Sequence, residues 1–299
     1  MTLHYHVDGE LVPADVAVVP VRDRGFLYGD AAFETLRAYG GTIFEWDAHA
    51  TRLKATCAIL GLDHGISNDE LRERIDATLS ANDLEEAYVR LSITRGVQPG
   101  KLTPRTVIEP TVVIIVSPLT RGGLEGRPVW DGPASVTMAD TERIPNAAVP
   151  ARAKTHNYLN GILARLEARD RGVDEALMCD AEGRVTEGAT SNCFFVTDGV
   201  VHTPDLTGPV LPGVTRSVVS ELAESAGIPM RSGRYEPADL FAADEVFLTN
   251  TTWEVRPVGQ VDDRTYEVGP VTDRLADAFR EYVERRHYRR SARDTGASD

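Results

Sequence analysis

The chain has 299 residues, of which 42% are hydrophobic, and it carries a formal net charge of −14 at pH 7. This length exceeds the usual domain size of about 100–150 residues, so we expect two domains that each bury a core. The charge argues against nucleic acid or an anionic membrane surface as a partner, and no apolar run is long enough to cross a bilayer.

The first half of the chain alternates between strand and helix patterns. Residues 5–12 predict a hairpin, because Asp8-Gly9 is a favoured two-residue turn. A strand is predicted at 33–39, with Phe33 on one face and Glu34 on the other. The hydrophobic periods further predict helices at 46–61 and 67–80 and strands at 88–95 and 111–116.

The stretch from Arg121 to Pro128 is the best candidate for a linker, because its glycines interrupt every hydrophobic period. We therefore expect a first domain at 1–120, a linker at 121–130 and a second domain at 131–299. The second half should contain three helices and a strand, and it should end in a frayed tail. These elements are a helix with the apolar face Leu159, Ile162, Leu163 and Leu166, a helix from Thr215 to about Ala226, a strand at 245–249, a helix with Leu275, Phe279 and Val283 on its inner face, and the tail at 293–299.

The segment Leu211-Pro-Gly-Val-Thr-Arg216 predicts a helix start that can bind a phosphate. A helix reached through Gly213 exposes the backbone N–H groups of Val214 and Thr215 at the positive end of the helix dipole. Taken alone, this motif is an ordinary helix start, because threonine is a common N-cap residue. Glu187 follows a turn and precedes an apolar strand, which places a carboxylate nearby in the sequence pattern. The cofactor that needs a phosphate seat, a carboxylate and an amine together is pyridoxal phosphate.

Only three lysines are available to supply the amine. Lys54 lies beside the buried stripe of a predicted helix, where its side chain should extend to water. Lys101 sits in a turn-rich loop that could not hold an amine rigidly. Lys154 precedes a helix, and a lysine at a junction between a strand and a helix can be both rigid and partly buried. Lys154 is therefore the candidate for a covalent link to the cofactor.

Three spaced motifs carry a family resemblance: Lys154-Thr-His-Asn-Tyr158-Leu, Glu187-x-Ala-x-x-Asn192-Cys-Phe194, and Val201-x-Thr203 leading to Leu211-x-Gly213-Val-x-Arg216. Together they resemble the pattern of the class IV, fold-type IV pyridoxal-phosphate aminotransferases. This family includes branched-chain amino acid aminotransferases, which the chain resembles most, as well as D-amino acid aminotransferases and aminodeoxychorismate lyases. Residues 24–37 and His49-x-x-Arg52-Leu53 look like its N-terminal motifs. The resemblance implies a two-domain α/β enzyme, with a small N-terminal α/β domain and a larger C-terminal α/β domain that has a barrel-like sheet.

The resemblance also implies roles for individual residues. Lys154 would hold pyridoxal 5'-phosphate as an internal aldimine and move the substrate proton, Glu187 would face the pyridine nitrogen, and Tyr158 would hydrogen-bond the phenolic oxygen. Arg52 would clamp the phosphate, although the residues alone also permit a solvated arginine at this position. The remaining expected cofactor contacts are Leu211, Gly213, Val214, Thr215 and Thr251. Asn192 is expected to stabilise the backbone near the site.

Substrate recognition is where family members diverge. Phe33, Tyr88 and Arg90 correspond to residues that line the substrate pockets of branched-chain enzymes, with Tyr28 contributing across a dimer interface. Thr252 lies in the loop Asn250-Thr251-Thr252, which departs from the Gly-Thr-Ala of those enzymes, and Thr35 stands where they carry glycine. Arg95 could supply a carboxylate trap, as in D-amino acid enzymes, or form a structural ion pair.

The favoured function is transfer of the amino group of a hydrophobic, branched-chain-like amino acid, in the L-form, to 2-oxoglutarate. An aminodeoxychorismate lyase would use the same lysine and cofactor but would need room for a ring and a second carboxylate. A D-amino acid aminotransferase remains open through Arg95. A catalytically inert scaffold is disfavoured, because Lys154, Tyr158 and Glu187 are all present.

The three cysteines are widely spaced, which predicts reduced thiols in a cytoplasmic protein and neither disulfides nor a metal site. The first six residues lack the basic and apolar regions of a signal peptide. Family sites are completed by a second subunit, and such closure excludes water from a carbanion, so a homodimer or a higher homo-oligomer is expected. The other expected partners are small amino acids and 2-oxo acids.

Overall fold

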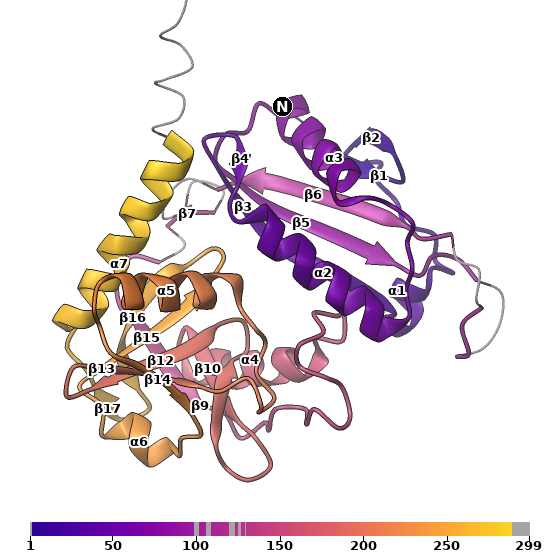
Figure 1. Ribbon diagram of the computed structural model, residues 1–299. Coiled ribbons are helices and arrows are strands. Elements are labelled where there is room, and N and C mark those ends of the chain that lie inside the picture. Colours follow the sequence, from indigo (N-terminus) through magenta and orange to yellow (C-terminus); the bar gives the residue numbers. More distant parts are fainter. Residues whose placement is uncertain are drawn as a thin grey trace, which may run out of the picture. The chain divides into compact units, whose positions relative to one another are not determined.

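The computed structural model describes residues 2–98, 102–105, 109–119, 123–124, 127–128 and 130–288. The chain forms two compact units (Figure 1), of which unit 1 comprises Met1–Pro128, Ala153–Asn157 and His287–Asp299, and unit 2 comprises Val129–Arg152 and Tyr158–Arg286. This division differs from the predicted one at a point that matters for the site, because Lys154 groups with the first unit. Lys101, the tail at 293–299 and part of the predicted linker lie outside the described residues.

Unit 1 contains a six-stranded antiparallel sheet in the order β2-β1-β6-β5-β3-β4. Its strands are β1 (His4–Val7), β2 (Glu10–Pro13), β3 (Ala31–Tyr39), β4 (Thr42–Ile43), β5 (Ala87–Thr94) and β6 (Val112–Pro118). The predicted hairpin is confirmed, since β1 and β2 are joined by Asp8 and Gly9, whose φ angles of 49° and 101° are both positive, as this tight turn requires. Strands β7 (Gly123–Leu124) and β8 (Arg127–Pro128) pair separately.

Two helices, α2 (Trp46–Leu60) and α3 (Asn68–Ala81), cover one face of this sheet (Figure 1). Leu53 of α2 and Leu71 of α3 join Leu36 of β3 in one buried core. Both helices were predicted from the hydrophobic period to within one or two residues, and α3 begins after Ser67, its expected cap. Phe33 lies on the opposite face of β3, which does not contribute to this core.

Unit 2 is built on a nine-stranded sheet in which six strands close into a ring. The ring runs through β11 (Val185–Gly188), β10 (Glu175–Cys179), β9 (Ala134–Met138), β16 (Glu254–Val261), β15 (Glu245–Asn250) and β12 (Asn192–Thr197), and β12 pairs back onto β11. Strands β13 (Val200–Pro204) and β14 (Met230–Gly233) extend the sheet from β12, and β17 (Arg264–Thr265) pairs with β16. The expected α/β fold with a barrel-like sheet is confirmed.

The helices of unit 2 are α4 (Leu159–Arg171), α5 (Val214–Ser225), α6 (Pro237–Phe241) and α7 (Pro270–Val283), and α7 continues into η1 (Glu284–Tyr288). As predicted, α7 turns Leu275, Phe279 and Val283 inward. None of the helices in the described part of the chain combines the length and apolar character that a membrane span requires. A short helix of unit 1, α1 (Arg24–Tyr28), precedes β3. The three cysteines are free thiols.

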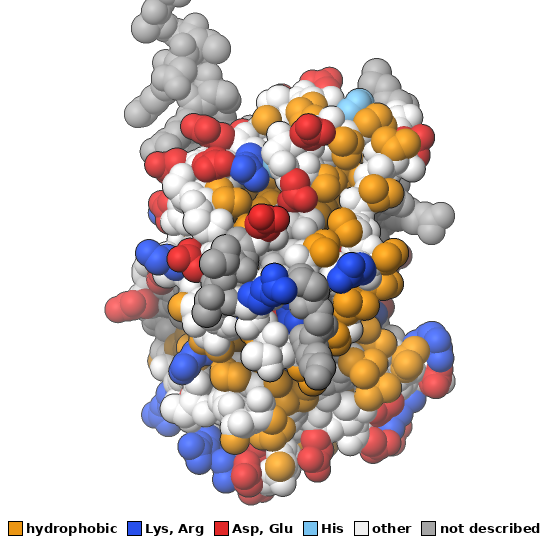
Figure 2. Space-filling view, turned by 90° about the vertical axis from the view of Figure 1, so that its right-hand side faces the viewer, with side chains coloured by type: hydrophobic (Ala, Val, Ile, Leu, Met, Phe, Trp, Pro, Cys, Tyr) orange, Lys and Arg blue, Asp and Glu red, His pale blue; other side chains and the backbone are white. Residues whose placement is uncertain are grey.

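The apolar face predicted for helix α4 is not the face that the helix buries. The leucines and isoleucine that form its apolar face are exposed, from 67% at Leu159 to 38% at Leu166. The helix instead packs through small residues, since Ala164 and Ala168 are buried against β10 and its neighbours. Periodicity located the apolar stripe but could not tell that the buried side is made of alanines. Exposed hydrophobic side chains are also visible in the space-filling view of Figure 2.

Candidate active site

Lys154 is held between β3 and α2 in unit 1. Its carbonyl oxygen accepts a hydrogen bond of 3.0 Å from Phe33 N, and its N–H donates to Thr56 Oγ1 over 3.0 Å. The next residue, Thr155, forms an antiparallel bridge with Ala32. Because the backbone is bonded on both sides, the half-buried Lys154 side chain extends from a rigid position.

The Lys154 side chain lies against the ring of Phe33. Its Nζ atom is 4.5 Å from the ring centroid, and the Arg90 guanidinium is 3.9 Å from the same centroid. The His156 ring makes an edge contact with Phe33 at 5.5 Å between centroids. Tyr88 lies on the same sheet face, because it pairs with a residue four positions along β3 from Phe33. This face therefore gathers aromatic and cationic side chains around the Lys154 amine.

His156 stays uncharged in this cluster. Its Nε2 is 3.2 Å from Ser92 Oγ. Burial, together with the positive charge of Arg90, lowers the pKa of His156 to about 4. A neutral imidazole beside two cationic side chains limits the repulsion within the cluster.

Arg52 is bound to a carboxylate, Glu34, that the sequence placed on the face of β3 opposite Phe33. The guanidinium donates from Nε to Oε1 (2.9 Å) and from Nη2 to Oε2 (2.6 Å), and His49 Nδ1 is 2.8 Å from Oε2. Glu34 is fully buried. Burial alone would raise the pKa of Glu34, but Arg52 and His49 hold it at about 2. The carboxylate therefore fixes the plane of the Arg52 guanidinium.

Arg95 makes structural contacts. Its Nε and Nη2 atoms donate to the two carboxylate oxygens of Asp30 over 2.8 and 3.0 Å. Nη1 donates to Gly61 O (2.8 Å) and Nη2 to Leu60 O (2.7 Å), and the residue is 4% exposed. Of the two interpretations of Arg95, this geometry favours the structural ion pair over the carboxylate trap.

Tyr28 ends the short helix α1, and this helix is firmly anchored. Asp23 caps it by accepting a 2.6 Å hydrogen bond from Gly25 N, and the same carboxylate accepts one of 2.7 Å from Thr94 Oγ1. Tyr28 is nevertheless 39% exposed, and Phe26 is 73% exposed. A rigid helix thus presents aromatic side chains to the outside of the chain.

Glu187 is buried at the end of β11 in unit 2, and both of its oxygens are engaged. Oε1 accepts from Arg143 Nε (3.0 Å) and Nη2 (2.8 Å), and Oε2 accepts from Leu211 N (3.0 Å) and Asn192 Nδ2 (3.2 Å). Asn192 Nδ2 also donates to Leu211 O over 3.0 Å. Asn192 therefore ties the acid to the segment that leads into α5, in agreement with its expected backbone role.

The predicted helix start is present, and no side chain caps it. Helix α5 begins at Val214, with Gly213 as its N-cap. A Cβ atom at position 213 would lie 2.0 Å from Asn192 Oδ1, so the backbone approaches a neighbour as only glycine allows. Val214 and Thr215 are both buried. Unpaired N–H groups at such a start suit an anion.

The loop that carries Thr251 and Thr252 is shaped by Asn250. Asn250 Oδ1 accepts from Thr252 N (3.0 Å), Thr252 Oγ1 (3.2 Å) and Trp253 N (2.7 Å). Its Nδ2 donates to Thr190 O over 3.3 Å, in the turn that follows Glu187. This side chain thus holds the loop in one conformation.

Three of these partners were not found from the sequence. Glu34 had a detectable signal, because a glutamate in a strand face shared with Leu36 and Ala38 needs a buried partner. Arg143 lies in an irregular segment with no period, so nothing in the sequence pointed to its contact with Glu187. Asn250 was noticed only as a departure from a family loop. Tyr158, in contrast, occupies the expected start of α4 as its N-cap.

The residues present fit the cofactor that the sequence indicated. Taken by itself, unit 1 holds an amine on a rigid backbone. Taken by itself, unit 2 holds a buried carboxylate and a helix that starts at a glycine. An amine suits an aldehyde, a helix N-terminus suits a phosphate, and a fixed carboxylate suits a ring N–H⁺.

Comparison with known proteins identifies the family. The amino-transferase class IV family model matches residues 31–261. A branched-chain-amino-acid aminotransferase of Pseudomonas aeruginosa is 34% identical, over 92% of this chain and 91% of its own. A D-alanine aminotransferase of Listeria monocytogenes is 32% identical over 93% of this chain and 96% of its own, and an aminodeoxychorismate lyase of Bacillus subtilis is 31% identical over 93% and 94%. The chain therefore belongs to the class IV aminotransferases.

Solved structures agree with this assignment. The branched-chain aminotransferase of Thermoproteus uzoniensis superimposes with a TM-score of 0.89 at 31% identity, covering 97% of each chain. The protein is a transaminase that depends on pyridoxal 5'-phosphate. Relatives with three different activities have nearly equal identities, so overall similarity alone does not decide the substrate.

Proposed function

We propose that this transaminase moves the amino group of a hydrophobic, branched-chain-like L-amino acid to 2-oxoglutarate. The observation that carries the proposal is the sheet face on which Phe33 lies under both Lys154 Nζ and the Arg90 guanidinium. An aromatic wall suits an aliphatic side chain, and a guanidinium suits a carboxylate. Branched-chain aminotransferases among the relatives and the structural neighbours support the same substrate class.

In this proposal Lys154 is the catalytic residue. When bound, the cofactor supplies a ring that accepts the electrons of the substrate Cα–H bond. Lys154 would hold the cofactor through its Nζ and, as a free amine, would take up the proton at the substrate Cα. Its backbone bonds to Phe33 and Thr56 keep the amine at one place while it does both tasks.

The remaining cofactor contacts come from residues whose local geometry suits each part of the molecule. Glu187, oriented by Arg143 and Asn192, would hold the proton on the pyridine nitrogen. Tyr158 would donate to the phenolic oxygen. Val214 and Thr215 would hold the phosphate through their N–H groups, and the other residues proposed to contact the cofactor are Arg52, Leu211, Gly213 and Thr251.

The substrate is expected to contact Phe33, Tyr88, Arg90 and Thr252. Arg95 is left out of this set, because its guanidinium is bound to Asp30 and to two carbonyl groups. Without Arg95 as a carboxylate trap, the D-amino acid interpretation loses the residue on which it depended. The lyase alternative still rests on a relative of 31% identity.

We further propose that the enzyme works in the cytoplasm as a homodimer at least. Two exposed apolar surfaces support a partner subunit: the aromatic side chains of α1, including Tyr28, and the aliphatic stripe of α4. Burial of such surfaces against a second chain is favourable by about 25 cal/mol per Å² of apolar area. The expected role of Tyr28 is a contact with the substrate site of the partner subunit.

A panel of L- and D-amino acids offered with 2-oxoglutarate tests the substrate. Glutamate should form fastest with leucine or isoleucine. Faster transfer from D-alanine, or release of pyruvate from aminodeoxychorismate without an acceptor, would contradict the proposal and identify the alternative.

The catalytic assignment has a separate test. Borohydride reduction of the holoenzyme should attach the cofactor to the peptide that contains Lys154, and Lys154→Ala should lose both the label and the activity. Lys54→Ala is the matched control, because Lys54 is an exposed lysine of α2 that should affect neither. Labelling of any other lysine would contradict the assignment of Lys154 as the catalytic lysine.

A further inference from the structure

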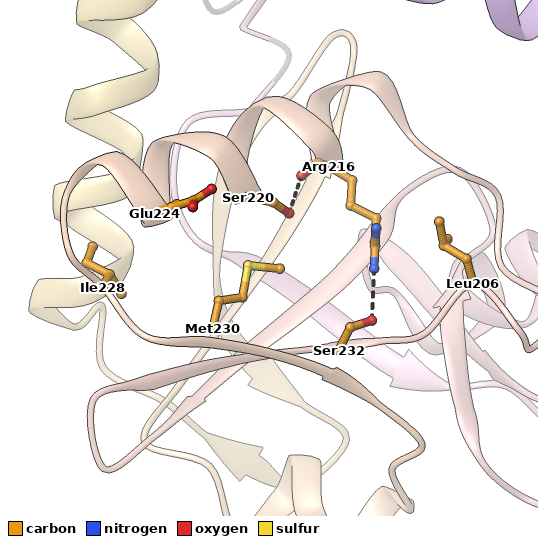
Figure 3. Close-up of a pocket in the computed structure, with 7 residues that line it drawn as sticks. All are labelled: Leu206, Arg216, Ser220, Glu224, Ile228, Met230 and Ser232. Carbon is orange, nitrogen blue, oxygen red and sulfur yellow. Dashed lines mark hydrogen bonds between the residues drawn. The ribbon is translucent and has the colours of Figure 1, made fainter.

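A pocket of about 600 Å³ lies in unit 2 between α5 and β14 (Figure 3). It is lined by Leu206, Arg216, Ser220, Glu224, Ile228, Met230 and Ser232. None of these residues belongs to the cofactor or substrate set proposed above. Arg216 closes the motif that begins at Leu211, and the proposed reaction gives it no task.

The Arg216 side chain is a buried charge without a counter-ion. The residue is 8% exposed, and its Nη2 donates to Pro204 O (3.1 Å) and to Ser232 Oγ (3.4 Å). Its Nε has no hydrogen-bond partner. Among the residues that the structure describes, no carboxylate lies within 4.0 Å of the guanidinium nitrogens.

An anion bound beside the Arg216 guanidinium would stabilise its buried charge. An arginine keeps its proton in proteins, and a buried ion that lacks both a partner charge and a full set of hydrogen bonds is costly. Burial lowers the pKa of Arg216, although Glu187 and Asp205 oppose this effect from a longer distance. Arg216 lines a pocket that is large enough for a small organic anion.

The other residues that line the pocket indicate which class of anion fits it. Arg216, Ser220 and Glu224 follow one another at i, i+4 and i+8 along α5, so Glu224 lies about 12 Å along the helix from Arg216. Met230 and Ser232 share one face of β14 and lie across from the helix (Figure 3). The pocket thus has a cationic end, apolar walls and an anionic end.

We propose that this pocket binds a small aliphatic monocarboxylate. The carboxylate oxygens accept from the Arg216 guanidinium and from Ser232 Oγ, and the hydrocarbon part packs against Leu206 and Met230. Glu224 disfavours a second carboxylate at the far end, because two like charges would share a partly enclosed space. The 2-oxo acids made from hydrophobic amino acids belong to this class, and this identification of a natural ligand, unlike the pocket itself, rests on the proposed function.

Calorimetric titration of the borohydride-reduced holoenzyme with 4-methylvalerate tests the site. A binding step should be present that weakens about tenfold or more in Ser232→Ala and in Arg216→Lys, because each loses a hydrogen bond to a charged group. Ser232→Ala is the decisive variant, since a partly exposed hydroxyl can be removed without leaving a buried charge. Circular dichroism should show that both variants are folded.

Charge selection gives a second readout. Glu224→Gln should strengthen the binding of glutarate, a dicarboxylate, several-fold at low salt, whereas Glu221→Gln should not. Glu221 is the matched control, because it is an exposed glutamate of the same helix that does not line the pocket. Absence of any step sensitive to Ser232, or an equal effect of the two glutamate variants, would overturn the proposal. Tighter Arg216-dependent binding of inorganic phosphate than of 4-methylvalerate would overturn the carboxylate class.

The outcome is separable from that of the substrate panel. The panel reports amino transfer. The titration reports binding to a chain in which the C=N bond between Lys154 and the cofactor has been reduced, so that the chain cannot turn over. If the panel contradicts the proposed substrate but the titration detects binding, the proposed pocket still stands. If the panel supports the substrate but the titration detects no binding, only the proposed pocket is refuted.

Discussion

Replacing Glu34 by glutamine removes the carboxylate around which Arg52 and His49 are arranged. The three side chains lie between β3 and α2, and Glu34 is fully buried. Glutamine has nearly the same shape but carries no charge, and its amide group offers donors to a guanidinium that is itself a donor. The change therefore leaves the Arg52 charge without its partner.

The size of the effect follows from the pKa of Glu34. It is held at about 2, against an ordinary value of 4.5. At about 1.36 kcal/mol per pH unit, this corresponds to about 3 kcal/mol of preference for the charged form in the folded chain. Loss of one partner of a buried pair typically costs about 3–5 kcal/mol, which agrees with this magnitude. We expect Glu34→Gln to lower the free energy of unfolding by about 3 kcal/mol at pH 7.

The pH dependence has a definite sign. Because the pKa of Glu34 is lower in the folded chain, its contribution is fully present above pH 4.5 and is lost as the pH falls toward 2. Urea unfolding followed by circular dichroism, at saturating cofactor, should give a constant difference between wild type and variant from pH 8 to pH 5. The difference should shrink at lower pH.

Asp76→Asn is the control for this measurement. Asp76 pairs with Arg72 on the surface of α3 and is 44% exposed, so its loss should cost about 0.5 kcal/mol or less. Equal stabilities of wild type and Glu34→Gln at pH 7, or a difference that grows in acid, would refute the account of a charged Glu34 held by Arg52.

Three further predictions concern single side chains. Gly213→Ala should weaken cofactor binding about tenfold or more in a spectrophotometric titration, because the new Cβ would meet Asn192 Oδ1 at 2.0 Å, whereas Gly132→Ala, which has open space, should not. Asn250→Ala should raise the KM for the amino donor about tenfold by releasing three accepted hydrogen bonds, and Asn250→Asp, which keeps the accepting oxygen, should restore it. The pKa of His156 is lowered to about 4, so the unfolded chain gains a proton before the folded chain does, and His156→Gln should reduce the loss of stability between pH 6.5 and pH 4, measured as the urea midpoint.

The elements of this fold were largely predictable because their signals are local. The hairpin at Asp8-Gly9 depends on the backbone preferences of adjacent residues, and α3 depends on a cap and a period within one segment. The helix start at Gly213 was equally predictable, since a helix start is formed by residues that follow one another. For the same reason Lys154 could be singled out among three lysines.

The contacts that orient the site lie outside such local patterns. Lys154 N reaches Thr56 across 98 positions, and Arg143 reaches Glu187 across 44. Periodicity gives the face of a side chain but not the element that comes to lie opposite it. The buried side of α4 was misjudged on the same ground, because alanine pairs carry a weaker hydrophobic signal than the exposed leucines.

The amino-acid sequence by itself determined the elements, the family motifs and the chemical types available for a cofactor, because each depends on residues close together along the chain. Only the tertiary structure decided that Glu34 holds Arg52, that Arg95 is engaged with Asp30, and that Arg216, whose Nε is buried and unpaired, lines a pocket. Whether two charged side chains form an ion pair depends on their distance in space. That distance is set by the folding of the chain and cannot be read from the spacing of the residues in the sequence.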